Sequence, residues 1–268
     1  MFKQIIVIAG VARSGTSWIA QIIDSSPDIT FRFQPLFSYT FKNAVTEDST
    51  REEYLNFFNR IYNSSDDFLL QTDKRKSKLY PVFQKNSAPR RLAFKENGHQ
   101  YVLPKMLQYF ENLQLVGIVR HPCGTLNSWL QNPKEFPPDA DPRREWRFGS
   151  CKNQGKAENF FGYYKWKEVA NLYLDLKDKY PHKFFIAKYD EIVNNPVDLA
   201  KSIFDFLNLE FSEQTRSFLE TSHSTHRDNP YAVFKDKSVK ERWRAELDPY
   251  IVNEVLYDLK DTRLEIFL

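Results

Sequence analysis

The sequence KQIIVIAGVARSGTSW at residues 3–18 decides the fold of this chain. Its apolar half, rich in Ile and Val, predicts a buried parallel strand, and the apolar spacing that follows predicts a helix over about residues 17–25. A glycine-bounded turn joins the two. Strand, glycine-rich loop and helix together point backbone N–H groups and a helix dipole toward a phosphate.

The loop differs from the common nucleoside-triphosphate loop at one position. Gly10, Gly15 and Ser17 stand where the pattern G-x-x-x-x-G-K-[ST] places them, but Thr16 occupies the lysine position. A loop that holds a β- or γ-phosphate beside Mg²⁺ would lack its main cation. The cation here is Arg13, inside the loop. The residues therefore predict a phosphate-binding loop with a different chemistry, and a tight turn with close helix packing is the plain alternative.

Composition places the chain among ordinary globular proteins. Its 268 residues fit a single α/β domain, 1–268, in which 41% of residues are hydrophobic and 27% charged. A net charge of +3 argues against a nucleic-acid partner and is compatible with a local anion site. Two cysteines, Cys123 and Cys151, provide neither a disulfide framework nor a metal cluster, and a reducing compartment is the default for such thiols.

The chain contains no apolar run long enough to predict a membrane span. The apolar segment near the N-terminus leads directly into the loop and is too short for a signal peptide. We therefore expect a cytoplasmic protein without a membrane span, and the sequence leaves its oligomeric state open.

Strands and helices alternate along the rest of the chain. Apolar runs predict strands at residues 29–33, 92–96, 113–119 and 183–188. Amphipathic spacing predicts helices at residues 51–62, 101–110, 122–131, 158–180, 213–220, 239–245 and 249–259, with a further helix from residue 196. This order predicts a mostly parallel central sheet with helices on both faces, a three-layer sandwich.

Two long polar segments interrupt this alternation. Residues 64–91, rich in Lys and Arg, are interpreted as a solvated loop, with a mobile flap over an anionic ligand as the alternative. Residues 132–155 are interpreted as a second loop over the carboxyl edge of the sheet. Long loops inside compact domains are uncommon and often functional.

A second motif follows the strand at residues 113–119. Arg120 and Pro122 stand at its end, and Ser128 follows eight residues after the arginine. A strand-end Arg can grip a phosphate through a bidentate fork while a hydroxyl on the next helix donates to the same group. The alternative is a capping arginine and a solvent-facing serine.

The motifs together resemble the sulfotransferases that use 3′-phosphoadenosine-5′-phosphosulfate (PAPS). The loop of that family reads Lys or Arg, any residue, Gly, Thr, Thr or Ser, Trp, and its second motif reads Val-Arg-Asn/Asp-Pro with a downstream Ser. Here His121 replaces the Asn or Asp. A third match is Tyr189 at the end of a strand, before the helix that starts with Pro196. The resemblance covers residues 5 to about 200 and implies a P-loop-like α/β fold.

The resemblance also implies a set of donor-binding residues. The residues matched to the 5′ end of PAPS are Arg13, Ser14, Gly15, Thr16, Ser17 and Trp18, and those matched to its 3′-phosphate or nucleotide are Arg120, Ser128 and Tyr189. Arg13 is the candidate for stabilising charge on the leaving phosphate, and loss of such a contact typically costs about 10²–10³ in rate. The transferred group carries less charge than a γ-phosphoryl, so no Mg²⁺ ligand set is expected.

The acceptor hydroxyl needs a base. Cytosolic relatives have a His two positions beyond a strand Lys, where this chain has Asn97. Glu96 and His99 flank that position, and Glu96 is the favoured candidate. The alternative is that Lys95 and Glu96 merely pair or face solvent. Gln34, where carbohydrate sulfotransferases often have Glu, cannot act as a base.

The C-terminal match is weaker. Residues 240–244 resemble a late basic element with a tryptophan, but the Arg-Lys-Gly triplet of the cytosolic enzymes is absent. The prediction is a sulfotransferase that moves a sulfuryl group from PAPS to a hydroxyl or amine of a small-molecule, carbohydrate or lipid acceptor. The alternatives are a P-loop nucleotide kinase, against which Thr16 argues, and a non-catalytic nucleotide-binding protein.

Overall fold

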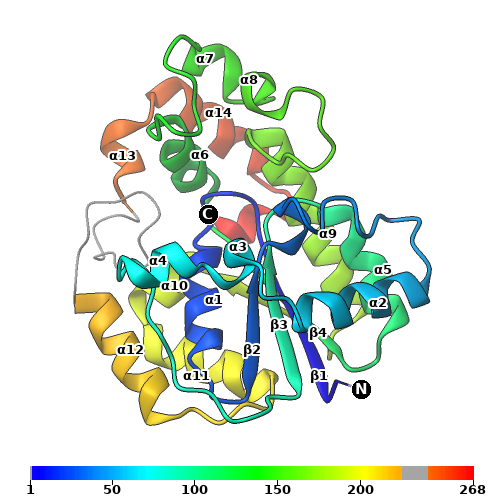
Figure 1. Ribbon diagram of the computed structural model, residues 1–268. Helices are drawn as coiled ribbons and strands as arrows, with labels where there is room; N and C mark the ends of the chain where they lie inside the picture. The colour runs from blue at the N-terminus through cyan, green and yellow to red at the C-terminus, as the bar shows by residue number, and fades with distance from the viewer. Residues whose placement is uncertain (1, 225–240) are drawn as a thin grey trace.

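A five-stranded parallel sheet forms the centre of the molecule (Figure 1). The computed structural model describes residues 2–224 and 241–268. The strand order is β2-β3-β1-β4-β5, and all four pairings are parallel. The strands are β1 (Gln4–Ala9), β2 (Ile29–Phe33), β3 (Arg91–Glu96), β4 (Leu113–Val119) and β5 (Phe184–Lys188). The predicted α/β class is confirmed.

Helices cover both faces of this sheet, as Figure 1 shows. One face carries α1 (Thr16–Asp24), α10 (Tyr189–Asn194), α11 (Pro196–Phe206) and α12 (Glu213–Ser224). The other carries α2 (Arg51–Tyr62), α5 (Leu103–Tyr109) and α9 (Tyr163–Lys179). The helices α6 (Pro122–Leu130) and α14 (Pro249–Leu259) lie beyond the carboxyl ends of the strands in Figure 1, where α6 contacts α9 and α14. The shorter helices are α3 (Asp67–Leu70), α4 (Thr72–Lys76), α7 (Pro142–Glu145), α8 (Ser150–Asn153) and α13 (Trp243–Glu246).

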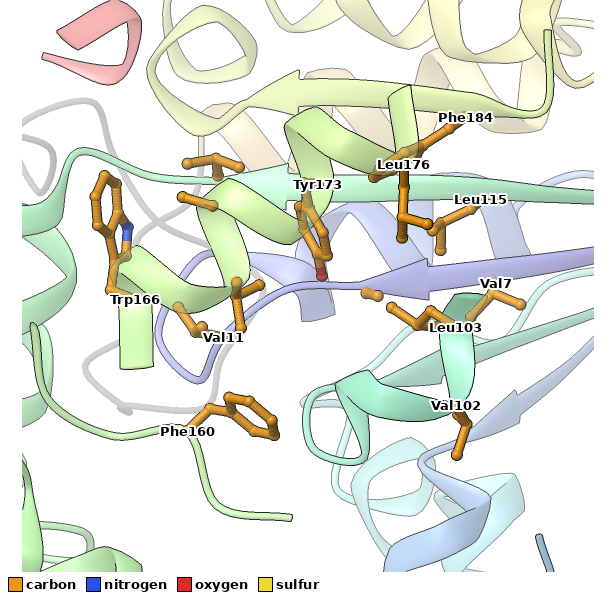
Figure 2. Close-up of a cluster of buried hydrophobic side chains, with 14 of the residues drawn as sticks. Val7, Val11, Val102, Leu103, Leu115, Phe160, Trp166, Tyr173, Leu176 and Phe184 are labelled. Atoms are coloured by element: carbon orange, nitrogen blue, oxygen red, sulfur yellow. The ribbon is translucent and has the colours of Figure 1, made fainter. Parts of the chain in front are cut away.

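The alternation of side chains along each strand builds two separate hydrophobic cores. Val7 and Leu115 face the α9 side of the sheet, whereas their neighbours Ile6 and Ile8 face the α1 side. Figure 2 shows Tyr173 of α9 among the apolar side chains of the core on the α9 side of the sheet. Burial of each large apolar side chain contributes about 1.5–3 kcal/mol. Because β1 is buried on both faces, the loop at its end is held from both sides.

Several predicted boundaries are wrong in detail. The helix expected at residues 158–180 begins only at Tyr163, because Gly162 has a φ of 91° and leaves the helical region. The segments interpreted as loops contain the short helices α3, α4, α7 and α8, and Cys151 lies in α8. Of the helix expected at residues 239–245, the first two residues lie outside the described part, and α13 covers residues 243–246.

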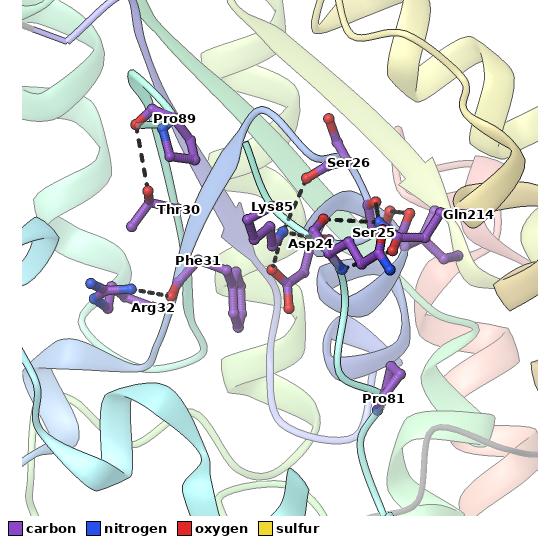
Figure 3. Close-up of polar contacts among 12 residues, drawn as sticks. Asp24, Ser25, Ser26, Thr30, Phe31, Arg32, Pro81, Lys85, Pro89 and Gln214 are labelled. Atoms are coloured by element: carbon purple, nitrogen blue, oxygen red, sulfur yellow. Dashed lines mark hydrogen bonds and ion pairs between the residues drawn. The ribbon is translucent and has the colours of Figure 1, made fainter. Parts of the chain in front are cut away.

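The segment at residues 64–91 is largely exposed, as interpreted from the sequence, but it is also anchored to the core. Asp24, at the end of α1, is 1% exposed, and its carboxylate pairs with Arg75 and Lys85, each at 2.8 Å. Lys85 also donates to the carbonyl of Ser26 at 3.0 Å (Figure 3). A buried carboxylate with two cationic partners is costly to break. The two ion pairs therefore fix this segment against α1.

Candidate active site

A cavity of about 650 Å³ opens at the carboxyl ends of the strands. Residues that follow each of the five strands contribute to its wall: Arg13, Gln34, Asn97, Arg120 and Tyr189. Ligands of open α/β sheets bind in the crevice outside this edge. The cavity is therefore the candidate site.

The loop after β1 carries backbone amides to one wall of the cavity. Gly15 is the N-cap of α1 with a φ of 88°, and Arg13 also has a positive φ of 72°. The amides of the first helical turn have no partner within the helix, and the dipole makes this end positive. A Cβ on Gly15 would lie 2.4 Å from the ring of Tyr189, so the ring packs directly on the loop.

Arg13, Arg120 and Ser128 meet at this loop. Arg13 Nε donates to Ser128 Oγ at 3.1 Å, and Arg120 Nη1 donates to the carbonyl of Arg13 at 3.2 Å. The Arg120 guanidinium lies 4.7 Å from the centroid of the Tyr189 ring. Gly124 makes room for it, because a Cβ there would lie 2.9 Å from Arg120 Nε. Burial lowers the pKa of Arg120 from its usual value.

Lys95, at the end of β3, is a further cation of the cavity. Its side chain is 2% exposed, and Nζ donates to Ser17 Oγ at 3.0 Å. Burial, followed by the charge of Lys74, lowers the pKa of Lys95 to about 7. Sequence reasoning did not assign Lys95 to the site. The sequence did contain a signal for this role, a lysine near the end of a strand predicted from an apolar run.

The two residues predicted as the base lie beside the cavity rather than on its wall. Glu96 is 1% exposed, and its carboxylate accepts from the amides of Leu36 at 3.4 Å and Gly98 at 3.3 Å. His99 Nδ1 lies 3.7 Å from Glu96 Oε1. The alternative in which Lys95 and Glu96 face solvent is wrong, since both are buried. A role for Glu96 or His99 as the base stays a prediction.

Two carboxylates among the described residues do line the cavity. They belong to Glu135 and Glu158, and Glu135 Oε1 lies 3.8 Å from Arg13 Nη1. Lys74 and Tyr80 line it from the segment anchored on Asp24. Sequence reasoning missed these residues because their segments carry no periodic pattern.

Most of the predicted donor-binding residues share the cavity. The wall includes Arg13, Gly15, Thr16, Ser17, Trp18, Arg120, Ser128 and Tyr189. Ser14, within the loop, is fully buried and is not part of the wall. Thr16, at the position of the missing loop lysine, donates to Asn97 Oδ1 at 2.8 Å.

A parallel sheet with a glycine-rich loop, a helix N-terminus and a basic cavity at its carboxyl edge defines a P-loop-like α/β protein with a candidate anion site. The chain belongs to the sulfotransferase family, whose model matches residues 5–213. Comparison with curated proteins gives no match.

Several solved structures share the fold over nearly the whole chain. A sulfotransferase domain from the curacin biosynthetic pathway is 15% identical, with 96% of this chain and 97% of that chain covered and a TM-score of 0.55. Mouse sulfotransferase SULT7A1, complexed with PAP, is 15% identical, with 99% and 88% covered and a TM-score of 0.57. Retinol dehydratase in complex with androsterone and the inactive cofactor PAP is 14% identical, with 98% and 83% covered and a TM-score of 0.53. At these identities the likeness shows the fold.

Three further observations concern the described residues, 2–224 and 241–268. No helix there combines the length and apolar character needed to cross a bilayer. No group of three or more His, Cys, Asp or Glu side chains in that part is placed to hold a metal ion. Cys123 and Cys151 are both free thiols.

Proposed function

We propose that this protein transfers the sulfuryl group of PAPS to a hydroxyl or amine of an acceptor molecule. The observation that carries the proposal is the convergence of Arg13, Arg120 and Ser128 on one cavity, beside the first-turn amides of α1. Membership of the sulfotransferase family supports it, as do the structures of the same fold that were solved with PAP.

Both phosphates of the donor would have matching groups in the cavity. The amides of Gly15, Thr16 and Ser17 would hold the 5′-phosphate at the N-terminus of α1. Arg120 would hold the 3′-phosphate through its guanidinium fork, with the hydroxyl of Ser128 as a further donor. The buried Arg120 has a lowered pKa, and an anion beside it would offset the cost of burial.

The chemistry needs cations at the leaving group. The acceptor oxygen forms a bond to sulfur while the bond between sulfur and the bridging oxygen breaks. The electron pair of the broken bond stays on the 5′-phosphate of the product, adenosine 3′,5′-bisphosphate (PAP). Arg13 and Lys95, which line the same cavity, would stabilise that charge.

The acceptor's proton must pass to a base as the new bond forms. The sequence favours Glu96, with His99 second, and both remain predictions. On geometric grounds Glu135 is a third candidate, because its carboxylate reaches the cavity beside Arg13.

Two expectations outside the site also remain proposals. We propose that the chain forms a single domain, 1–268, with one active site. We propose a reducing, cytoplasmic compartment, which is supported by the free thiols of the buried Cys123 and the half-buried Cys151.

The test combines binding and turnover. Calorimetry with PAP should give 1:1 binding, and radiolabelled PAPS with a mixed acceptor library should give a labelled product. Arg13→Ala should lower turnover by about 10²–10³-fold and leave the thermal unfolding temperature unchanged. Arg216→Ala, which removes an arginine of α12 outside the cavity, is the control.

Other results of these binding and turnover measurements would contradict the proposed role of Arg13 or the proposed function itself. Full turnover by Arg13→Ala would remove Arg13 from the mechanism. PAP binding without turnover on any acceptor would favour a non-catalytic nucleotide-binding protein, and Mg²⁺-dependent binding of ATP in place of PAP would favour a nucleotide kinase.

A further inference from the structure

Part of the cavity lies beyond the residues assigned to the donor. The following inference rests on the proposed function and concerns the acceptor. Two segments supply much of this part of the wall: residues 68–80, which follow α2, and residues 152–161, which precede α9. We call this part of the wall the acceptor region, together with Lys134 and Glu135.

The acceptor region has more cations than carboxylates. Among the residues that the structure describes, seven cationic side chains and two carboxylates line the whole cavity. The donor, with about four negative charges at neutral pH, accounts for Arg13, Lys95 and Arg120. The carboxylates that remain are Glu135 and Glu158, and the cations that remain are Lys74, Lys134, Lys152 and Lys156. Taken together, the seven cations, the two carboxylates and the four charges of the donor leave the cavity with about one net positive charge.

Lys74 is held in a desolvated position on the wall. Its Nζ lies 4.8 Å from the centroid of Phe33 and 4.9 Å from that of Tyr80, and burial lowers its pKa. Lys95 Nζ lies 4.5 Å from the same Phe33 ring. Two ammonium groups against one ring raise each other's energy, and an anion between them would lower it. Arg75, next to Lys74, anchors this segment on the buried Asp24.

The loop that carries Lys152 and Lys156 is internally braced. Asn153 is buried, and its Nδ2 donates to the carbonyls of Phe148 at 2.7 Å and Phe161 at 2.8 Å. Its Oδ1 accepts from the amide of Phe161 at 3.0 Å, and its carbonyl accepts from the amide of Lys156 at 2.8 Å. Lys152 and Lys156 are therefore presented to the cavity by a defined loop.

Neutral polar groups accompany these lysines. The amide side chains of Gln34, Gln154 and Asn159 line the cavity, and the rings of Phe37 and Phe160 provide flat apolar surface beside them. Amides that both donate and accept suit a molecule with several hydroxyl groups.

We propose that the acceptor is a hydroxyl-rich anion, a sugar that carries a carboxylate, sulfate or phosphate of its own, which Lys74, Lys152 and Lys156 bind. The donor and this acceptor would bring negative charges of the same sign into one cavity, and the lysines would offset their repulsion. One negative charge on the acceptor would balance the net positive charge that the cavity keeps when the donor is bound.

The experiment compares matched acceptors. One pair is a tetrasaccharide that contains uronic acids and its carboxyl-reduced counterpart; the other is glucose 6-phosphate and glucose. Binding of each to the PAP-saturated protein is measured by calorimetry, and sulfuryl transfer from radiolabelled PAPS is measured in parallel. The anionic member of at least one pair should bind about tenfold more tightly, and this preference should shrink as the salt concentration rises.

Variants test whether the lysines carry the preference. Lys152→Gln with Lys156→Gln should weaken binding of the anionic member about tenfold and leave its neutral counterpart unchanged. The matched control is Lys201→Gln with Lys260→Gln, which removes two exposed positive charges outside the cavity. PAP binding should be the same in all forms.

The outcomes separate this inference from the proposed function. Loss of PAP binding in the unaltered protein would overturn the proposed function. Normal PAP binding with equal affinity for both members of each pair, or with a preference that the lysine variants retain, would overturn the inference alone. A preference within the tetrasaccharide pair would indicate that the site binds a carboxylate, and a preference within the glucose pair would indicate that it binds a phosphate.

Discussion

Lys95 illustrates how a single buried charge can set the pH response of a site. Its pKa of about 7 lies far below the usual 10.5, so in the free protein it is mostly neutral above pH 7. A bound anion favours the protonated form and raises this pKa again. Donor binding above pH 7 should therefore take up a proton, and below pH 7 it should not.

The corresponding prediction is a decline in PAP affinity with rising pH. The decline should approach about tenfold per pH unit above pH 7, because the proton must be supplied from solution. Calorimetry at pH 8 in buffers of different ionisation enthalpy measures the uptake directly. Lys95→Met should bind PAP weakly and without this pH dependence. Zero proton uptake by the unaltered protein at pH 8 would contradict the assignment.

A second prediction at this scale separates the candidate bases. Loss of the base should lower kcat by about 10²–10⁴-fold and remove the ascending limb of the pH–rate profile. We expect this result from Glu135→Gln, because Glu135 reaches the cavity. Glu96→Gln should instead lower the unfolding temperature, since its carboxylate accepts two backbone amides.

The control for this comparison is Glu158→Gln, which removes the other carboxylate of the wall. It should leave the shape of the pH–rate profile intact. If Glu96→Gln abolishes turnover in a stably folded protein while Glu135→Gln does not, the base predicted from the sequence is correct.

Single residues differed in how far their roles could be predicted from sequence. Arg13, Arg120 and Ser128 stand in motifs with fixed spacing after strands, so their meeting could be anticipated. Lys74 and Glu135 lie in polar segments, where a lysine or a glutamate is usually solvated. Arg75, next to Lys74, pairs with Asp24, and Glu135 pairs with Arg13; local sequence patterns do not encode such long-range ion pairs.

Among the elements, the loop between β1 and α1 has the strictest backbone requirement. Gly15 combines a positive φ with direct contact to the Tyr189 ring. Gly155 also has a positive φ, of 69°, but apart from its two chain neighbours no described residue has an atom within 4 Å of the place that a Cβ would take there. Comparing substitutions at Gly15 and Gly155 therefore separates the cost of backbone strain from the cost of steric contact.

Gly155→Ala should cost only the strain of a left-handed alanine, about 1 kcal/mol in the free energy of unfolding. Gly15→Ala should cost more and weaken PAP binding at least about tenfold, because either the ring or the loop must move. Chemical denaturation and calorimetry measure the two effects. Equal costs for the two variants, with PAP binding intact, would show that the Tyr189 contact is unimportant.

Elements with strong hydrophobic periodicity were predicted best. The strands and the helices α1, α2 and α6 lie within a residue or two of their expected positions, since burial on a sheet dictates their pattern. The helix α9 begins late because Gly162 approaches the backbone of residues 147–149 closely, a tertiary contact with no local signature.

At the scale of the whole molecule, the C-terminal part docks on the helix that follows Arg120. The His121 ring stacks on Trp243 with centroids 4.5 Å apart, and Asn127 Nδ2 donates to Glu246 at 2.7 Å. The basic tryptophan element noted in the sequence therefore packs on α6. Burial lowers the pKa of His121 to about 4.

This contact predicts acid sensitivity. Between pH 6.5 and about 4 the unfolded chain binds a proton at His121 that the folded chain does not, so stability falls as the pH falls through this window. The loss should reach about 2–3 kcal/mol. His121→Asn, which can still cap α6, should reduce the loss by that amount. Denaturation at pH 7 and pH 4.5 measures it, and identical losses in both proteins would exclude His121 as the cause.

The Tyr189 ring beside Gly15 has a consequence for the order in which the molecule assembles. The loop that follows β1 is made first on the ribosome, yet the ring that packs against it comes directly after β5, an edge strand of the sheet. A nascent chain that ends before β5 carries every residue of the loop and lacks the surface that shapes it. The proposed binding of the nucleotide should therefore become possible only late in synthesis, when the edge strand joins the sheet.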